Sequence, residues 1–178
     1  MLEHIKRGIY VSLVAVMAVM PLKRVWSQSN EASRYSDINT VITELYNVIS
    51  GPSGERDWVL FKSLFHSNAT MGAIRVSNTG ERNFVYFTPD EYISRNDGFF
   101  KTNDFYEKEL GRKVNLFGGL AQVFTAYEYR LNYNQKIKVR GVNCIQLIFE
   151  KERWFITSIV WEEESAKNKI PSDMINTN

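Results

Sequence analysis

Residues 140–161 read RGVNCIQLIFEKERWFITSIVW, two runs rich in β-branched and aromatic residues that meet at Lys151-Glu152. Two such runs separated by so short a break predict an antiparallel hairpin. If the turn lies at Lys151-Glu152, Phe149 faces Trp154. In this register one face of the hairpin carries Phe149, Leu147, Ile145 and Asn143 beside Trp154, Ile156, Ser158 and Val160.

Two polar residues, Asn143 and Ser158, stand among apolar neighbours on this face. An unpaired buried polar group costs about 1–3 kcal/mol. The two residues lie diagonally across the hairpin, about 7–8 Å apart, which is too far for a direct bond. Backbone groups, Tyr127 of the preceding strand, water or a ligand could satisfy them. We therefore predict a semi-polar pocket floor, with ordinary hydrogen-bonded core residues as the alternative.

The residues before the hairpin complete an α+β pattern. Helical spacing predicts helices at residues 37–50 and 55–65, and a third begins with a capping box at Thr88-Pro89-Asp90-Glu91 and ends before Asp97-Gly98. Alternation predicts strands at residues 69–76, 83–87, 107–117, 120–131, 136–150 and 153–163. Because the last four strands have short connections, we expect a curved antiparallel sheet with about three helices on its concave face.

The opposite face of the hairpin is also largely apolar. It is expected to carry Val142, Cys144, Gln146 and Ile148 beside Phe155, Thr157, Ile159 and Trp161. An exposed apolar patch of this extent usually marks a partner surface, and a second copy of the chain in a two-fold homodimer is the economical occupant. A shifted register, or cover by the C-terminal tail, is the alternative. Cys144 is the one cysteine, so no intrachain disulfide can form, and packing is its expected role.

The N-terminal residues have the order of a secretory signal peptide. Lys6-Arg7 precedes an uncharged apolar run at residues 9–22, and polar residues follow. The run is shorter than the about 20 residues of a membrane-spanning helix. We expect a signal peptide at residues 1–28 and a periplasmic or secreted protein with no stable membrane insertion after cleavage. Lys23-Arg24, directly after the run, leaves an uncleaved anchor as the alternative.

Cleavage would change the charge of the chain. It removes four of 22 basic residues and one of 20 acidic residues, which leaves 18 against 19 and a net charge of −1. No clustered basic face of the kind that nucleic-acid binders carry remains, so no nucleic-acid partner is expected.

After the signal peptide, we expect one domain at residues 36–164 and a flexible tail at residues 165–178.

The order of elements and the closing hairpin resemble the nuclear transport factor 2-like superfamily, in particular its exported bacterial SnoaL-like members. The local match is Arg140-Gly141-Val142-Asn143-Cys144-Ile145-Gln146-Leu147, followed by Arg153-Trp154-Phe155-Ile156 and Trp161. It is similar to an RG-x-N/S-x-x-Q-L strand that precedes an RW-x-I strand. The resemblance covers residues 37–163 and implies a cone-shaped cavity between helices and sheet, and commonly a dimer. It assigns no activity, because this fold serves enzymes, ligand binders and assembly modules alike.

The leading functional prediction is a protein that binds a small, mostly apolar molecule in the cone. Tyr127, Asn143, Trp154 and Ser158 would form the floor, and His66 would lie nearer the rim. A non-catalytic dimerisation module is one alternative. One Cys and one His after cleavage are too few for a zinc site, and no glycine-rich phosphate loop is present, so we expect no metal and no cofactor.

An enzyme is the other alternative. The resemblance implies that enzymes of this superfamily use a carboxylate or a His–Asp pair in the cone, so His66 would be the base of an isomerase, dehydratase or cyclase. No paired carboxylate is evident from the sequence. Glu128, Glu150 and Glu163 are expected to alternate outward, and Glu107 and Glu109 to share a solvated face, which weakens the enzyme interpretation.

Overall fold

The computed structural model describes residues 33–175; the predicted signal peptide lies outside this range. The helices are α2 (Ile38–Ile49), α3 (Trp58–Ser63) and α4 (Pro89–Thr102). The strands are β1 (Phe65–Val76), β2 (Arg82–Phe87), β3 (Tyr106–Phe117), β4 (Leu120–Arg130), β5 (Val139–Glu150) and β6 (Arg153–Glu163), and a 3-10 turn, η1 (Ser172–Met174), follows.

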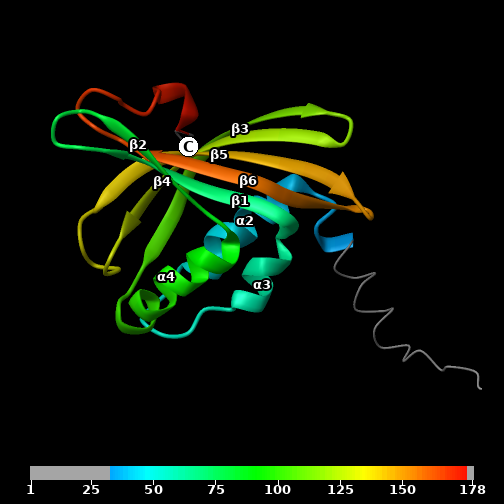
Figure 1. Cartoon of the computed structure of the whole chain (residues 1–178), viewed down its shortest axis with the longest axis horizontal. Coiled ribbons are helices and arrows are strands. Elements are labelled where there is room, and N and C mark those ends of the chain that lie inside the picture. Colours follow the sequence, from blue (N-terminus) through cyan, green and yellow to red (C-terminus); the bar gives the residue numbers. More distant parts are fainter. Residues whose placement is uncertain (1–32, 176–178) are drawn as a thin grey trace, which may run out of the picture.

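The six strands form one sheet in the order β2-β1-β6-β5-β4-β3. All neighbours pair antiparallel except β1 and β6, which run parallel. Figure 1 shows the sheet curving over α2, α3 and α4, which all lie on one of its faces. The predicted α+β class, with a curved sheet and three helices on its concave side, is confirmed. The parallel pair is the one departure from the antiparallel expectation, and the long chain between β1 and β6 makes it possible.

Helix α2 forms where the sequence predicts it. Asp37 caps its start, because the carboxylate accepts hydrogen bonds from the backbone N–H groups of Asn39 and Thr40, both at 3.2 Å. Its apolar stripe, which includes the fully buried Val41 and Ile42, packs into the concave sheet. The helix is therefore held by both a local cap and tertiary burial.

Helix α4 begins as predicted but ends later. Thr88 and Glu91 form the expected capping box. The predicted end before Asp97-Gly98 is wrong, because the helix continues to Thr102. Asp97 accepts a hydrogen bond from Trp58 Nε1 at 2.7 Å and pairs with Lys101 at 2.8 Å. These contacts offset the about 1 kcal/mol that a glycine inside a helix costs.

The β5–β6 hairpin turns at Lys151-Glu152, where both residues have positive φ, 51° and 63°. Phe149 pairs with Trp154, as predicted. Farther along, the register shifts from Leu147–Ile156 to Gln146–Ser158, so Thr157 is an extra residue in β6. Such a bulge reverses the alternation beyond it.

The bulge overturns part of the predicted face assignment. Ser158 lies on the outer face, where its hydroxyl donates to Gln146 Oε1 at 3.3 Å, and its predicted inward position is wrong. Ile159 and Trp161, predicted to face outward, line the concave side instead. On the concave side of this part of β6, the apolar side chains of Ile159 and Trp161 therefore take the place of the predicted Ser158.

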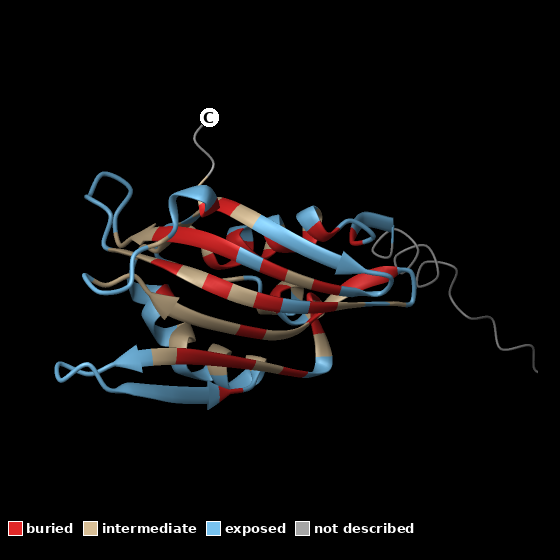
Figure 2. Cartoon of the chain, turned by 90° about the horizontal axis from the view of Figure 1, so that it is seen from above, coloured by how far each residue is buried: buried red, intermediate tan, exposed pale blue. Residues whose placement is uncertain are grey.

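The segment after Glu164 lies across the convex face of the sheet, opposite the helices, as the red trace in Figure 1 shows. Met174 is buried there, and Asp173 pairs with Lys113 of β3. Figure 2 shows buried bands along the central strands, whereas β2 is exposed up to Phe87. The tail thus covers part of the outer face; its mobility and the homodimer stay predictions. None of the helices within residues 33–175 is long and apolar enough to cross a membrane.

Gly141 of β5 makes room for the ring of Tyr127 on the concave face. A Cβ at this position would lie 2.4 Å from Tyr127 Oη and 2.7 Å from the backbone oxygen of Glu162. The backbone oxygen cannot move without disturbing the sheet. The glycine of the RG-x-N pattern is therefore required by packing.

Gly141→Ala is expected to destabilise the fold by about 1–3 kcal/mol, because the added methyl group overpacks the contact between Tyr127 and the sheet. Gly119→Ala is the matched control: its nearest neighbour would be 3.6 Å away, an ordinary contact. Urea denaturation of both variants checks the prediction. Equal losses of stability in the two variants would contradict it.

Candidate functional site

A cavity of about 350 Å³ lies between the helices and the concave face of the sheet. Its wall is mostly apolar and aromatic, with rings contributed by both layers, among them Phe61, Tyr92, Phe99, Phe100, Phe105 and Trp161. Polar groups enter this wall at Tyr46, Asn96, Glu107, Asn143 and Glu163. A concave apolar site with a few convergent polar groups is the usual form of a small-molecule site.

A chain of hydrogen bonds runs from the cavity into the sheet. Asn143 Nδ2 donates to the Tyr46 hydroxyl at 3.0 Å, and that hydroxyl lies 2.8 Å from Thr125 Oγ1. Thr125 in turn donates to Glu109 Oε1 at 2.9 Å. Arg112 completes the chain, since its Nε donates to the same carboxylate at 2.7 Å. The buried polar residues of this region are thus satisfied by one network that joins α2 to β3, β4 and β5.

Tyr46, rather than Tyr127, is therefore the partner of Asn143. Burial raises the pKa of the Tyr46 phenol above its ordinary value, so the group stays neutral and able to donate. Tyr46 lies on the buried face of α2, and the sequence gives no sign of its partner. A register that brings Thr125 opposite Asn143 in the β4–β5 pair is what assembles the three groups.

The carboxyl group of Glu107 enters the cavity from the start of β3. Glu107 pairs with Tyr129 in the β3–β4 ladder. The backbone N–H of Glu107 donates to Ser50 Oγ at 3.0 Å, and Ser50 Oγ donates to the Glu107 carbonyl at 2.9 Å. Two further bonds join Phe105 to Gly51, at 2.7 and 2.9 Å. The C-terminal end of α2 therefore fixes the backbone that carries Glu107.

The predicted solvated face for Glu107 and Glu109 is wrong. The register of β3 on β4 shifts between Glu109 and Gly111, so Leu110 is an extra residue. Without this bulge Glu107 would stand opposite Arg130 and face outward; with it, Glu107 stands opposite Tyr129 and faces the cavity. The two glutamates do share a face, as predicted, but it is the concave one.

Glu107 has an unusual electrostatic position. Within residues 33–175 its carboxyl group forms no hydrogen bond and no ion pair, and burial raises its pKa to about 8. The same carboxyl raises the pKa of the Tyr92 and Tyr127 phenols further, after desolvation as the larger cause. Glu107 therefore carries a proton over most of the neutral range and can exchange it.

Arg75 and Glu163 mark the open edge of the cavity. Arg75 Nη1 lies 3.6 Å from Glu163 Oε1, and both side chains are partly exposed. Glu163 was predicted to alternate outward, which is wrong because it follows the Thr157 bulge on β6. An exposed pair of this kind stabilises the fold little.

The structure brings together only part of the predicted site. Tyr127 and Asn143 line the cavity. Trp154 faces the concave side but packs against Phe149 at the turn end of the hairpin, with ring centroids 5.2 Å apart, outside the cavity lining. Ser158 is on the outer face, as described above.

His66 also lies outside the cavity lining. It is on β1 with its side chain 30% exposed, and its Nε2 is 3.6 Å from Glu150 Oε2. That separation exceeds a hydrogen bond, and neither group reaches the cavity. His66 is therefore not placed to act as a base on a molecule bound in the cavity.

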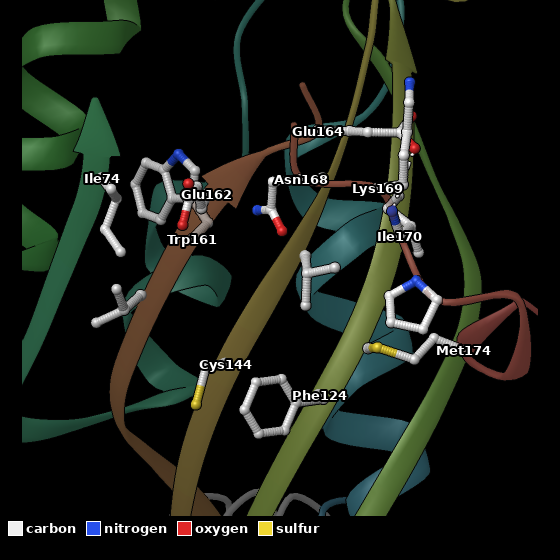
Figure 3. A pocket seen from close by; sticks show the side chains of 14 residues that line it. Ile74, Phe124, Cys144, Trp161, Glu162, Glu164, Asn168, Lys169, Ile170 and Met174 are labelled. Atoms are coloured by element: carbon white, nitrogen blue, oxygen red, sulfur yellow. Dashed lines mark hydrogen bonds between the residues drawn. The ribbon is translucent and has the colours of Figure 1, made fainter. Parts of the chain in front are cut away.

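A second hollow of about 290 Å³ lies on the outer face, under the tail. Figure 3 shows Phe124 and Cys144 of the sheet on one side of it and Ile170 and Met174 of the tail on the other. Partial burial raises the pKa of the Cys144 thiol. This supports the predicted packing role of Cys144, because a reactive thiol needs a lowered pKa.

The arrangement in the cone suits binding and proton exchange. No group of three or more His, Cys, Asp or Glu side chains within residues 33–175 is placed to hold a metal ion. The one carboxyl without a protein partner there, Glu107, is surrounded by rings. The cavity can thus hold an apolar molecule and present it with a carboxyl group that has no partner within residues 33–175.

Comparison with known proteins gives the fold. No protein-family profile and no curated protein matches the sequence. A protein of unknown function with a cystatin-like fold from Nostoc punctiforme has a TM-score of 0.56 and 8% identity, over 72% of this chain and 90% of that one. A protein of unknown function from Mycobacterium tuberculosis has a TM-score of 0.56 and 14% identity, over 90% and 86%.

A third solved structure carries the family name. It is a protein of the NTF2-like family, proposed to be a dehydratase, from Streptomyces avermitilis, with a TM-score of 0.55 and 9% identity over 78% of this chain and 99% of that one. Identities this low show the fold alone. The chain has the nuclear transport factor 2-like (NTF2-like) fold, as the closing hairpin predicted.

Proposed function

We propose that the protein binds a small, mostly apolar molecule in the cone, with Glu107 as the polar group that meets it. The observation that carries this proposal is a cavity of about 350 Å³ whose aromatic wall contains a carboxyl group, that of Glu107, with no partner among the described residues. Ligand sites span about 300–1,000 Å³, so this one suits a molecule at the small end. Tyr127 and Asn143 keep their predicted roles in the wall.

The position of Glu107 supports a ligand contact over a structural role. A buried carboxyl that stabilises a fold is normally paired or hydrogen-bonded. Glu109, two residues away, shows that arrangement, because Thr125 and Arg112 satisfy it. The rigid backbone at Ser50 and Gly51 would hold the carboxyl in place for a ligand.

Filling the open edge is expected to weaken binding. Leu131 lines the cavity and is partly exposed, so Leu131→Trp should weaken binding of the neutral fluorophore N-phenyl-1-naphthylamine at least about tenfold, or about 1.4 kcal/mol. Leu120→Trp, on the outer face where Leu120 is 60% exposed, is the matched control and should bind as the unmodified protein does. Fluorescence titration measures both. Failure of the unmodified protein to bind any neutral apolar probe would refute the proposal.

A second candidate function is proton transfer to or from the bound molecule by Glu107. Its raised pKa favours this, because a general acid or base works best when its pKa is near the operating pH. The reaction would be of the isomerase or dehydratase kind, with Glu107 in the role that the sequence suggested for His66. This candidate requires the titration of Glu107 near neutral pH.

The titration is expected to appear in the pH dependence of stability. A carboxyl with a pKa of about 8 in the folded state, against 4.5 as its ordinary value, stabilises the fold only while it is protonated. As pH rises from 4.5 to 8, the folding equilibrium constant should fall about tenfold per pH unit relative to Glu107→Gln, and level off above pH 8. Urea unfolding at several pH values measures this. Glu162→Gln, on the outer face, is the control, and parallel curves for Glu107→Gln and the unmodified protein would exclude the raised pKa.

We also propose export to the periplasm or the medium. Support comes from Lys6-Arg7 and the uncharged run at residues 9–22. Expression of the full chain in a bacterium, followed by fractionation and intact-mass measurement, should give a periplasmic or secreted product shortened by about 28 residues, as the signal-peptide pattern predicts. A full-length, membrane-bound product would favour the uncleaved anchor, and a full-length cytoplasmic product would contradict export.

A further inference from the structure

We infer that the cone cavity recognises an organic ammonium cation, because the carboxyl group of Glu107, which has no partner within residues 33–175, stands in a cavity lined by aromatic rings. This inference rests on the proposed function and specifies its ligand class. An aromatic enclosure attracts a cation through the negative faces of the rings. A carboxylate in the same enclosure supplies the matching charge.

The rings surround Glu107 from both layers of the fold. Tyr129 stands directly opposite it in the β3–β4 ladder, and Phe105 precedes it by two residues on the same face. The centroids of Phe105 and Tyr129 are 4.9 Å apart. Tyr92 of α4 and Tyr127 of β4 line the same cavity as Glu107, and its carboxyl acts electrostatically on both phenols.

None of the aromatic groups beside Glu107 supplies a charge. Burial raises the pKa of Tyr46, Tyr92, Tyr127 and Tyr129 above the ordinary phenol value, so all four are neutral at physiological pH. They can offer ring faces and hydroxyl dipoles but cannot neutralise a carboxylate. Compensation has to come from a basic side chain, a proton or a ligand.

The nearby basic side chains are engaged elsewhere. Arg75 pairs with Glu163 at the open edge. Arg56, which acts electrostatically on Tyr92, donates its Nε to the Ile49 carbonyl at 2.9 Å and its Nη1 and Nη2 to carbonyls of the following loop. Arg112 pairs with Glu109. Ionised Glu107 would therefore leave the cavity with one excess negative charge, which an ammonium ligand neutralises.

Binding of a cation must displace the proton that Glu107 holds in the free protein. With a pKa of about 8, affinity should fall about tenfold for each pH unit below 8 and level off above it. At pH 7 each bound cation should release close to one proton. A neutral ligand of the same shape should release none, so the two classes of ligand differ in a directly measurable way.

The experiment compares phenyltrimethylammonium with its uncharged shape analogue tert-butylbenzene, by isothermal titration calorimetry at pH 7 in two buffers of different ionisation enthalpy. We expect the cation to bind at least about tenfold more tightly than the neutral analogue and to release a proton. Glu107→Gln keeps the size of the protonated side chain. It should weaken the cation at least about tenfold and abolish proton release.

Glu162→Gln is the matched control, because it removes one negative charge from the outer face of β6 and should alter cation affinity less than about twofold, since a screened surface charge contributes little. Equal or tighter binding of the neutral analogue, or cation binding that is insensitive to Glu107→Gln, would overturn the ammonium assignment and leave the apolar pocket standing. Absence of binding by both probes, together with no binding of N-phenyl-1-naphthylamine, would overturn the proposed function itself. If Glu107→Gln does not fold, proton release by the unmodified protein is the test: release on cation binding supports the ammonium assignment, and its absence overturns it.

Discussion

The strict alternation of side chains along a strand is the constraint on which the cone depends, and two single-residue bulges reset it. Leu110 in β3 and Thr157 in β6 each add one residue to a ladder. Beyond each bulge the side chains change face. The two changes turn Glu107, Ile159, Trp161 and Glu163 toward the cavity.

The polar chemistry of the site follows from where the helix meets the sheet. The hydroxyl of Tyr46 in α2 forms hydrogen bonds with both Thr125 and Asn143, so three buried polar groups have partners. The C-terminal end of α2 then clamps the backbone at Phe105 and Glu107 through Gly51 and Ser50. One helix thus fixes both the satisfied network and the unpartnered acid beside it.

Most of the fold could be predicted from the sequence, because its signals are local. Helix caps at Asp37 and Thr88 and the turn at Lys151-Glu152 can be recognised within a few residues. Two of the four predicted floor residues, Tyr127 and Asn143, line the cavity, and their part in binding stays a prediction. The other faces were not predicted, because Thr157 and Leu110, the extra residues of the two bulges, are of types common in regular strands. Gly111, next to Leu110, is the one local signal of a bulge. The two bulges are the reason that Ser158 and Glu107 were assigned to the wrong faces.

The direction of the hydrogen bonds in this chain also determines which amide atom of Asn143 is left to bond a ligand. Glu109 only accepts, so Thr125 donates to it, the Tyr46 phenol donates to Thr125, and the amide nitrogen of Asn143 donates to the phenol. The other end of that amide, its carbonyl oxygen, has no hydrogen-bond partner within residues 33–175. The cavity therefore offers the carbonyl oxygen of Asn143 as a fixed hydrogen-bond acceptor beside the carboxyl group of Glu107. A ligand that carries a hydrogen-bond donor would suit both groups.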